Sequence, residues 1–446
     1  MVVEQYRLIK RRLKLRRSPV RKGRAAPGFE KKYQKEGLNF LYKLSALAFL
    51  LSFNKYPSLR VKNTAPALSN LLRVYEGMLR TLSSRPFCLD YERLLGLGYM
   101  KRKHWVYAAY ISLISSLPVL HKISSSSKVM RSAIAKTSFG TSVKLLDNLN
   151  DNVHDLDAAL ASLRNLLSAY TTGVYEPNLD CEYESVAKAE NSALEIGAWI
   201  YRMLSMGGSG PNRMFELYVK DVRKLIMGQV DSLSHKDEKR DGPPTMADYM
   251  QYVLEKNIGD VWFDIDLCFF EKGLGSLTPD DVRSLMLVKQ GVSLVFKAAG
   301  MYDDVVDAYE DIMSNSINST ILLAIERGLL PYDSLRRVKP AETFRTLSKL
   351  GIFDDIIKLG DAMHVTGLSM IRSGLKGRIG QLVDGDALLS VCNFIRLFSI
   401  RKYLIREKRL RQSLAFIRPP NPSVNLPEDL ELLWNELRGQ IVKGYC

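Results

Sequence analysis

Cysteine is scarce in this chain of 446 residues, and its spacing excludes the sites that cysteine usually builds. The five cysteines are scattered and odd in number, and none forms a Cys-x-x-Cys pair or a close cluster with histidine. They are Cys88, Cys181, Cys268, Cys392 and Cys446. We therefore expect a reducing compartment, no disulfide framework and no structural zinc.

Long apolar runs are missing as well. The longest, Leu38 to Phe53, is interrupted by Lys43 and is shorter than the roughly 20 residues that cross a bilayer. The N-terminus begins with charged and basic residues, and no apolar signal core follows directly. We expect a cytoplasmic protein without a transmembrane helix.

Several catalytic signatures are also absent. The sequence contains no P-loop and no Gly-x-Gly-x-x-Gly fingerprint, so nucleotide chemistry has no support. No Gly-x-Ser-x-Gly motif or cysteine-containing partner motif accompanies the five histidines, which makes a Ser/His/Asp nucleophilic site improbable.

Positive charge is abundant but unevenly placed. The formal net charge is +16, and residues 1–35 hold thirteen Lys and Arg against only Glu4 and Glu30. This basic tail is expected to be a disordered, solubilising arm, or to bind an acidic membrane surface, where each basic residue contributes about 1 kcal/mol. The small excess in the remaining chain gives no case for nucleic-acid binding.

After the tail, apolar residues recur at helical spacing almost everywhere, which predicts an all-α fold. No repeat and no further shift in composition divides the chain, so one helical domain is predicted for 36–446. Two breaks stand out, at 207–212 and 235–245. The predicted helices are 36–53, 66–84, 104–119, 142–170, 184–206, 213–233, 246–271, 279–299, 301–328, 353–375, 387–412 and 428–442.

A first acidic segment lies within the predicted helix 142–170. Residues four apart on a helix lie one above the other, so Asp147, Asp151 and Asp155 would form a column about 12 Å long. Like charges at this spacing destabilise a helix, and a bound cation would reverse that effect. The alternative interpretation is that these acids complement the dipole of a helix N-terminus.

A second acidic segment opens the predicted helix 301–328. Asp303, Asp307 and Asp311 stack at i, i+4 and i+8 beside apolar residues, and no Lys or Arg occurs between Tyr302 and Ile325. A solvated acidic face usually carries basic partners one turn away, so this pattern favours a cation site over an exposed surface.

Two acidic helices in one bundle suggest a specific chemistry. Mg²⁺ takes one or two carboxylates together with phosphate and water oxygens, so acidic faces opposed across an apolar cavity would clamp a diphosphate. The metal neutralises the diphosphate as it leaves, and departure of an allylic diphosphate produces a carbocation that needs a dry pocket.

These residues resemble the isoprenoid synthase superfamily of class I terpene synthases, trans-prenyltransferases and squalene and phytoene synthases. Asp303 to Asp311 fits the spacing of the family's second metal motif, N/D-D-x-x-S/T/D-x-x-x-E/D. Asp147 to Asp151 is similar to the first motif, DDxxD or DxxxD, with Asn148 in place of a second aspartate. The resemblance implies an α-helical bundle around an apolar cavity, a prenyl diphosphate substrate, and Mg²⁺ bound by Asp147, Asp151, Asp303, Asp307 and Asp311.

The resemblance also implies groups that bind the diphosphate. Lys256, followed by Gly259, is similar to the diphosphate-sensing Arg of terpene synthases, although lysine lacks the bidentate geometry of arginine. Arg401 and Tyr403 look like the Arg-Tyr pair that follows the second motif, with Lys402 between them.

Three functions remain open from the sequence. The first is a class I enzyme that ionises a prenyl diphosphate and cyclises the product. The second is a head-to-head prenyl transferase of the squalene or phytoene synthase type, which shares the same metal chemistry. The third is a non-catalytic helical protein that binds an acidic membrane or nucleic acid through its basic tail, and it leaves the acidic segments unexplained.

Overall fold

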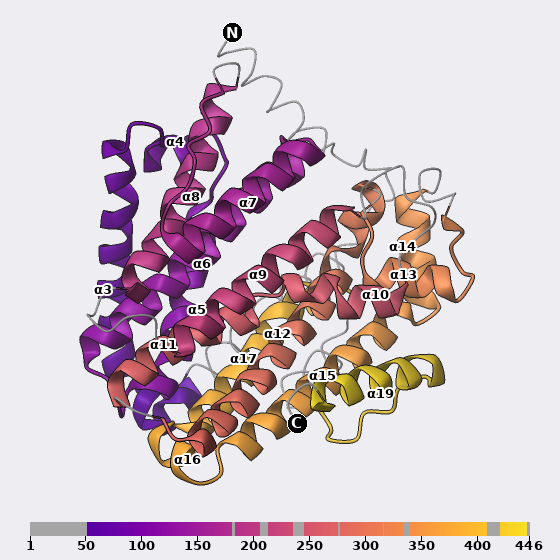
Figure 1. Cartoon of the computed structure of the whole chain (residues 1–446). Helices are drawn as coiled ribbons and strands as arrows, with labels where there is room; N and C mark the ends of the chain where they lie inside the picture. The colour runs from indigo at the N-terminus through magenta and orange to yellow at the C-terminus, as the bar shows by residue number, and fades with distance from the viewer. Residues whose placement is uncertain are drawn as a thin grey trace, which may run out of the picture. The chain divides into compact units, whose positions relative to one another are not determined.

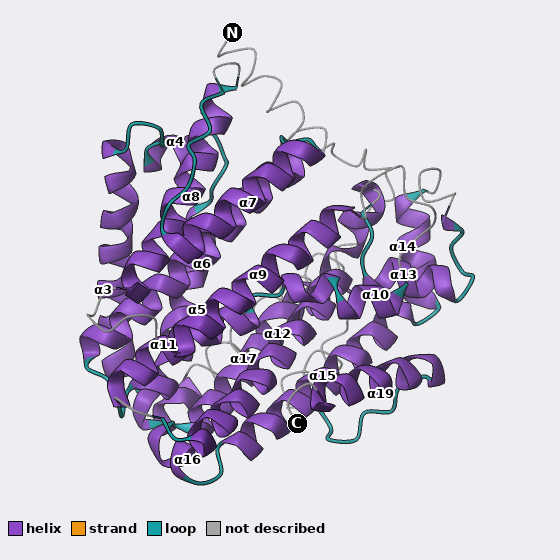
Figure 2. Ribbon diagram, viewed as in Figure 1, coloured by secondary structure: helices purple, strands orange, loops and turns teal. Residues whose placement is uncertain are grey.

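The computed structural model describes residues 51–180, 183–205, 213–234, 245–274, 277–314, 316–332, 339–407 and 420–443. Every regular element in these ranges is an α-helix or a 3-10 helix, and no strand occurs among them (Figure 2). The all-α prediction is confirmed. None of the described helices combines the length and apolar character that a membrane span requires. The basic tail 1–35, the predicted break 207–212 and all but the last residue of the break 235–245 lie outside the described residues.

The chain forms two compact units, and it passes from the first to the second within α5 and back again within α6. The single domain predicted for 36–446 stays a prediction. The first unit contains α3 (Val61–Arg80), α4 (Tyr91–Gly96), most of α5 (Arg102–Leu120) and of α6 (Ser126–Asn152), α7 (Leu156–Thr172) and α8 (Glu184–Ser205). The second contains α9 (Arg213–Ser234), α10 (Met246–Gln251), η4 (Val253–Lys256), α11 (Gly259–Leu274), α12 (Pro279–Ser314), α13 (Ser319–Glu326), α14 (Pro340–Lys349), α15 (Ile352–Gly374), α16 (Arg378–Leu382), α17 (Gly385–Glu407) and α19 (Glu428–Lys443) (Figure 1).

Most predicted helices are observed within a few residues of their expected bounds, and residues 36–50 of the predicted helix 36–53 lie outside the described residues. The predicted helix 246–271 is instead divided into α10, η4 and α11, and the predicted boundary between 279–299 and 301–328 is wrong, because α12 runs through it without a break.

Two further predictions near the acidic segments are also wrong. The predicted helix 142–170 is two helices, because Asp155 lies outside α6 and caps the N-terminus of α7 by accepting a hydrogen bond from the Ala158 amide. Asp155 therefore does not extend the column of Asp147 and Asp151. The predicted helix 301–328 divides in the same way at Asn318, whose side chain caps α13.

The second unit is organised around a close antiparallel pair, α12 and α15 (Figure 1). A Cβ atom on Gly291 would lie 2.4 Å from the carbonyl oxygen of Gly367, and one on Gly367 would lie 2.5 Å from the carbonyl oxygen of Gly291. About two turns further along α15, a Cβ on Gly374 would lie 2.5 Å from the carbonyl oxygen of Ser284. The two backbones are thus in direct contact, which only glycine permits.

Next to the second acidic segment, hydrogen-bonded side chains join α12 to its neighbours. The ring of Tyr302 occupies the space that Gly360 leaves open, and its hydroxyl donates to Asp361 at 2.6 Å. Arg396, on α17, donates to both oxygens of Asp361 at 2.8 and 2.9 Å. A bidentate charged pair has a fixed geometry, so these bonds fix α12, α15 and α17 relative to one another. Tyr302, the α12 residue in this group, directly precedes Asp303 in the sequence.

We predict that Gly367→Ala destabilises the protein by about 1–3 kcal/mol, because its methyl group would overlap backbone that cannot rotate away. Gly77→Ala in α3 is the matched control, since no atom would lie within 4 Å of a Cβ at that position, and alanine there should stabilise by about 0.5–1 kcal/mol. Urea denaturation followed by circular dichroism measures both changes. Equal effects of the two substitutions would contradict close backbone contact at Gly367.

Candidate metal and diphosphate site

The second acidic motif, Asp303 to Asp311, lies in about the last three turns of α12, and not in the first turns of a helix as predicted. Asp303 is exposed, and Asp307 and Asp311 are half-buried. A helix C-terminus carries partial negative charge, so carboxylates there are disfavoured unless a cation neutralises them. This placement puts the three carboxylates at the end of α12 where the helix dipole opposes their charge.

The carboxyl of Asp311 has a strongly raised pKa. Burial raises the pKa of its carboxyl to about 7, and the negative charges of Asp304 and Asp307 add to the effect. The Asn318 amide, which donates to Asp311 at 2.7 Å, and the charge of Lys256 act in the opposite direction on this pKa. Asp311 thus lies in a negative environment that is only partly compensated by the chain.

Asp304, also in this segment, has a structural role that the sequence analysis missed. Its carboxylate accepts hydrogen bonds from the Tyr249 hydroxyl at 2.7 Å and from the amide and hydroxyl of Ser319 at 3.1 and 2.6 Å. These bonds fix α10 and the start of α13 against α12. The sequence held a signal for the start of α13, because Asn318 followed by Ser, Thr and an apolar run is a typical helix start, but it held none for the contacts of Asp304.

Lys256 lies where the resemblance places a diphosphate ligand. Burial raises the pKa of both Asp304 and Asp311, and the positive charge of Lys256 opposes that rise, so the ammonium group is near the second acidic motif. Lys256 also donates to the Ser232 hydroxyl at 3.2 Å. A Cβ atom on Gly228 would lie 2.3 Å from the Lys256 amide nitrogen, so α9 packs tightly against η4. The backbone of Lys256 is therefore fixed by its packing against α9.

The first acidic motif, Asp147 to Asp151, occupies the last two turns of α6. Asp147 is half-buried and pairs with Lys144 at 2.5 Å, while Leu149 is fully buried. Asp151 belongs to the last helical turn, but its side chain lies outside the part of the structure that is described. Both acidic motifs thus end long helices, and they meet the same unfavourable helix dipole.

Basic groups gather beside this first motif, and the sequence analysis did not identify them. Burial, together with the charges of Lys144, Lys101 and Lys103, lowers the pKa of His104 to about 4. The start of α5 is therefore close to Lys144, and hence to Asp147. Lysines next to carboxylates suit a phosphate group that is shared with metal ions.

Arg401 and Tyr403 make packing contacts within the second unit. Tyr403 is buried, with its ring 6.2 Å from that of Phe353. The Arg401 guanidinium lies 3.6 Å from the centroid of the Phe398 ring and donates to the carbonyl oxygen of Phe398. Their assignment to diphosphate binding stays a prediction.

The donor atoms of the two motifs are all oxygen, which suits Mg²⁺. Within the described residues, no group of three or more His, Cys, Asp or Glu side chains is close enough together to hold a metal ion. Since Mg²⁺ usually takes one or two carboxylates and completes its shell with water and phosphate, the single carboxylates fit that role. In the second unit Asp303, Asp307 and Asp311 are the residues that would hold such an ion, and in the first unit Asp147 is.

No protein-family model matches the chain, and no curated protein matches its sequence. A geranylgeranyl pyrophosphate synthetase from the archaeon Geoglobus acetivorans is 13% identical, with a TM-score of 0.46, over 74% of this chain and 98% of that one. A variant of the SVS_A2 protein from ancestral sequence reconstruction is 12% identical, with a TM-score of 0.46, over 83% of this chain and 94% of that one. Likeness at this level establishes no common family, so the case for a function depends on the residues of this chain.

We predict that Asp311→Asn changes the pH dependence of stability in the absence of divalent metal. The folded pKa of about 7 is above the ordinary value of 3.8, so the stability that Asp311 contributes is complete below about pH 4 and is lost as the pH rises to 7. Asparagine does not ionise. The melting temperature of the variant should therefore rise relative to the parent protein between pH 4 and 8, as measured by thermal denaturation in EDTA. A constant difference would contradict the raised pKa.

We also predict different roles for Asp304 and Asp307. Asp304→Ala leaves the Tyr249 hydroxyl and the Ser319 groups without their acceptor and should cost about 2 kcal/mol or more. Asp307→Asn, one turn away on the same helix, should change the free energy of unfolding by less than about 1 kcal/mol. Urea unfolding of the two variants makes the comparison, and a larger loss for Asp307→Asn would reverse the assignment.

Proposed function

We propose that this protein is a Mg²⁺-dependent class I enzyme that ionises a prenyl diphosphate. The observation that carries the proposal is the position of Asp303, Asp307 and Asp311 in the C-terminal turns of α12, where the helix dipole opposes their charge and where burial and neighbouring carboxylates raise the pKa of Asp311. Mg²⁺ bound together with the substrate diphosphate would supply positive charge at these carboxylates. When bound, the metal neutralises the leaving diphosphate.

The chain's own residues then bind and orient the substrate. Lys256 contributes a positive charge next to the second acidic motif, and Lys101, Lys103 and Lys144 contribute charge next to the first. We assign these lysines to the phosphate oxygens, where they stabilise the charge that grows as the carbon–oxygen bond breaks. Asp311, with its pKa of about 7, would lose its proton on binding a metal ion.

The fate of the carbocation distinguishes a cyclase from a head-to-head prenyl transferase, and both use the same ionisation step. We therefore propose the class of reaction only, and mass analysis of the products distinguishes the two enzymes. The non-catalytic alternative depends on residues 1–35, which lie outside the described residues, and no described contact favours it.

The test is incubation of the full chain with Mg²⁺ and C10 to C20 prenyl diphosphates, followed by measurement of released diphosphate and mass analysis of extracted hydrocarbons. Asp307→Asn and Asp303→Asn should each lower the rate at least about 100-fold, because each removes charge that holds the metal at the leaving group. EDTA should abolish the activity.

Asp280→Asn is the matched control, since this exposed aspartate lies at the other end of α12 and pairs only with Arg283 among its described contacts. Its rate should equal that of the parent protein. Absence of diphosphate release from every substrate would refute the proposal, and so would equal rates in the Asp307→Asn and Asp280→Asn variants.

A further inference from the structure

The first acidic motif alternates carboxylates with amides, in the order Asp147, Asn148, Leu149, Asn150, Asp151. Each amide side chain contacts a different neighbouring element. Asn148 donates from Nδ2 to the carbonyl oxygen of Tyr99, at 2.9 Å, in the segment before α5. A carboxylate cannot make this bond, because it has no hydrogen to donate. Asparagine at 148, where the resemblance leads one to expect aspartate, therefore has a physical reason.

Asn150 makes the second set of contacts. Its Oδ1 accepts from the Ser162 hydroxyl at 3.2 Å, which ties α6 to α7, and lies 2.7 Å from Nδ1 of His154. His154 follows directly after the helix end, and its amide bonds back to the carbonyl oxygen of Leu149 at 3.0 Å. Backbone and side chain of His154 thus both close the last turn of α6.

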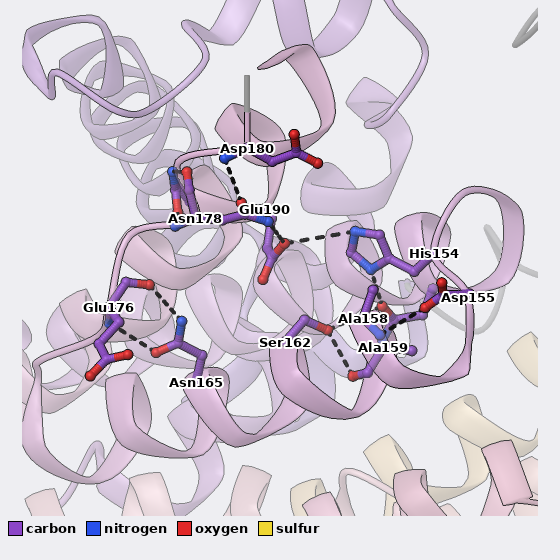
Figure 3. Close-up of polar contacts among 12 residues, drawn as sticks. His154, Asp155, Ala158, Ala159, Ser162, Asn165, Glu176, Asn178, Asp180 and Glu190 are labelled. Carbon is purple, nitrogen blue, oxygen red and sulfur yellow. Dashed lines mark hydrogen bonds and ion pairs between the residues drawn. The ribbon is translucent and has the colours of Figure 1, made fainter. Parts of the chain in front are cut away.

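His154 extends this network to α8. Its Nε2 lies 3.7 Å from an oxygen of Glu190, which in turn accepts from the Asn178 amide at 2.8 Å (Figure 3). Burial lowers the pKa of His154. A neutral ring that donates from Nδ1 to Asn150 presents an unprotonated Nε2 to Glu190, so the 3.7 Å approach to α8 is a packing contact and not an ion pair.

These contacts have a consequence for metal binding. The last turn of a helix lacks part of its hydrogen bonding and tends to fray, so a carboxylate there must be ordered before it can hold a cation. We propose that Asn148, Asn150 and His154 are positioning residues that hold the first acidic motif in its metal-binding geometry. This inference rests on the proposed function, since it assumes that Asp147 and Asp151 bind a divalent cation.

The network does not require any of its members to touch the substrate. Asn148 fixes the turn that carries Asp147, and the Asn150–His154 pair fixes the turn that carries Asp151. Partners of this kind around a metal ligand typically change metal affinity about 10- to 100-fold when they are removed.

The test measures Mn²⁺ affinity of the full chain in the presence of inorganic diphosphate, by electron paramagnetic resonance of free Mn²⁺, together with the melting temperature in EDTA. Asn148→Leu, Asn150→Leu and His154→Leu should each weaken Mn²⁺ binding about tenfold. His154→Gln, whose amide can still donate a hydrogen bond, should restore most of the affinity. The His154→Gln variant also keeps the inference testable if His154→Leu fails to fold.

Asn165→Leu is the matched control. Asn165 bridges the amide and carbonyl of Glu176 at 2.9 and 2.6 Å, in the same unit and away from the acidic motif (Figure 3). Its loss should lower the melting temperature and leave Mn²⁺ affinity unchanged. A purely structural role for Asn150 and His154 predicts the same behaviour in their variants, and that result would overturn the inference.

Asp147→Asn separates this inference from the proposed function. If Asp147→Asn weakens Mn²⁺ binding while Asn148→Leu, Asn150→Leu and His154→Leu bind like the parent protein, the positioning role is wrong and the metal site stands. If Asp147→Asn also binds like the parent protein, the first acidic motif holds no metal, and both the inference and this part of the proposed function fail.

Discussion

The direct contact between the backbones of α12 and α15 is the constraint on which the second unit depends. Gly291 and Gly367 leave no room for a side chain, so the two helices can pack in only one register. Tyr302 and the Asp361–Arg396 pair continue that register to the point where the second acidic motif begins. The carboxylates of α12 are thus attached to a rigid helix, as a preorganised site requires.

Both acidic motifs occupy the C-terminal turns of long helices, where the helix dipole opposes them. The chain offsets this cost only in part, through Lys256 and Asn318 near Asp311 and through Lys144 beside Asp147. Carboxylates at a helix C-terminus are stabilised when a cation binds to them. Burial, with the negative charges of Asp304 and Asp307, raises the pKa of Asp311 to about 7, so a metal ion bound there would displace a proton.

Helical periodicity was enough to predict the all-α fold and most helices, because apolar spacing reports which face of a helix is buried. The breaks at Asp155 and Asn318 were missed, since capping depends on one side chain turning back to the backbone while the apolar pattern runs on. The roles of Asp304 and Asn148 could not be predicted either, because their partners Tyr249 and Tyr99 are distant in sequence. The candidate carboxylates themselves were recognisable from i, i+4 spacing.

The most direct test of the central claim, that the acidic motifs hold divalent metal together with diphosphate, is a crystal structure of the full chain grown with Mn²⁺ and inorganic diphosphate. Anomalous diffraction locates the Mn²⁺ ions directly. The account predicts Mn²⁺ bound to carboxylate oxygens of the second acidic motif and of Asp147, at about the 2.0–2.2 Å typical of such ligands, with diphosphate oxygens completing the shell. Diphosphate bound elsewhere, with no Mn²⁺ at either motif, would contradict it.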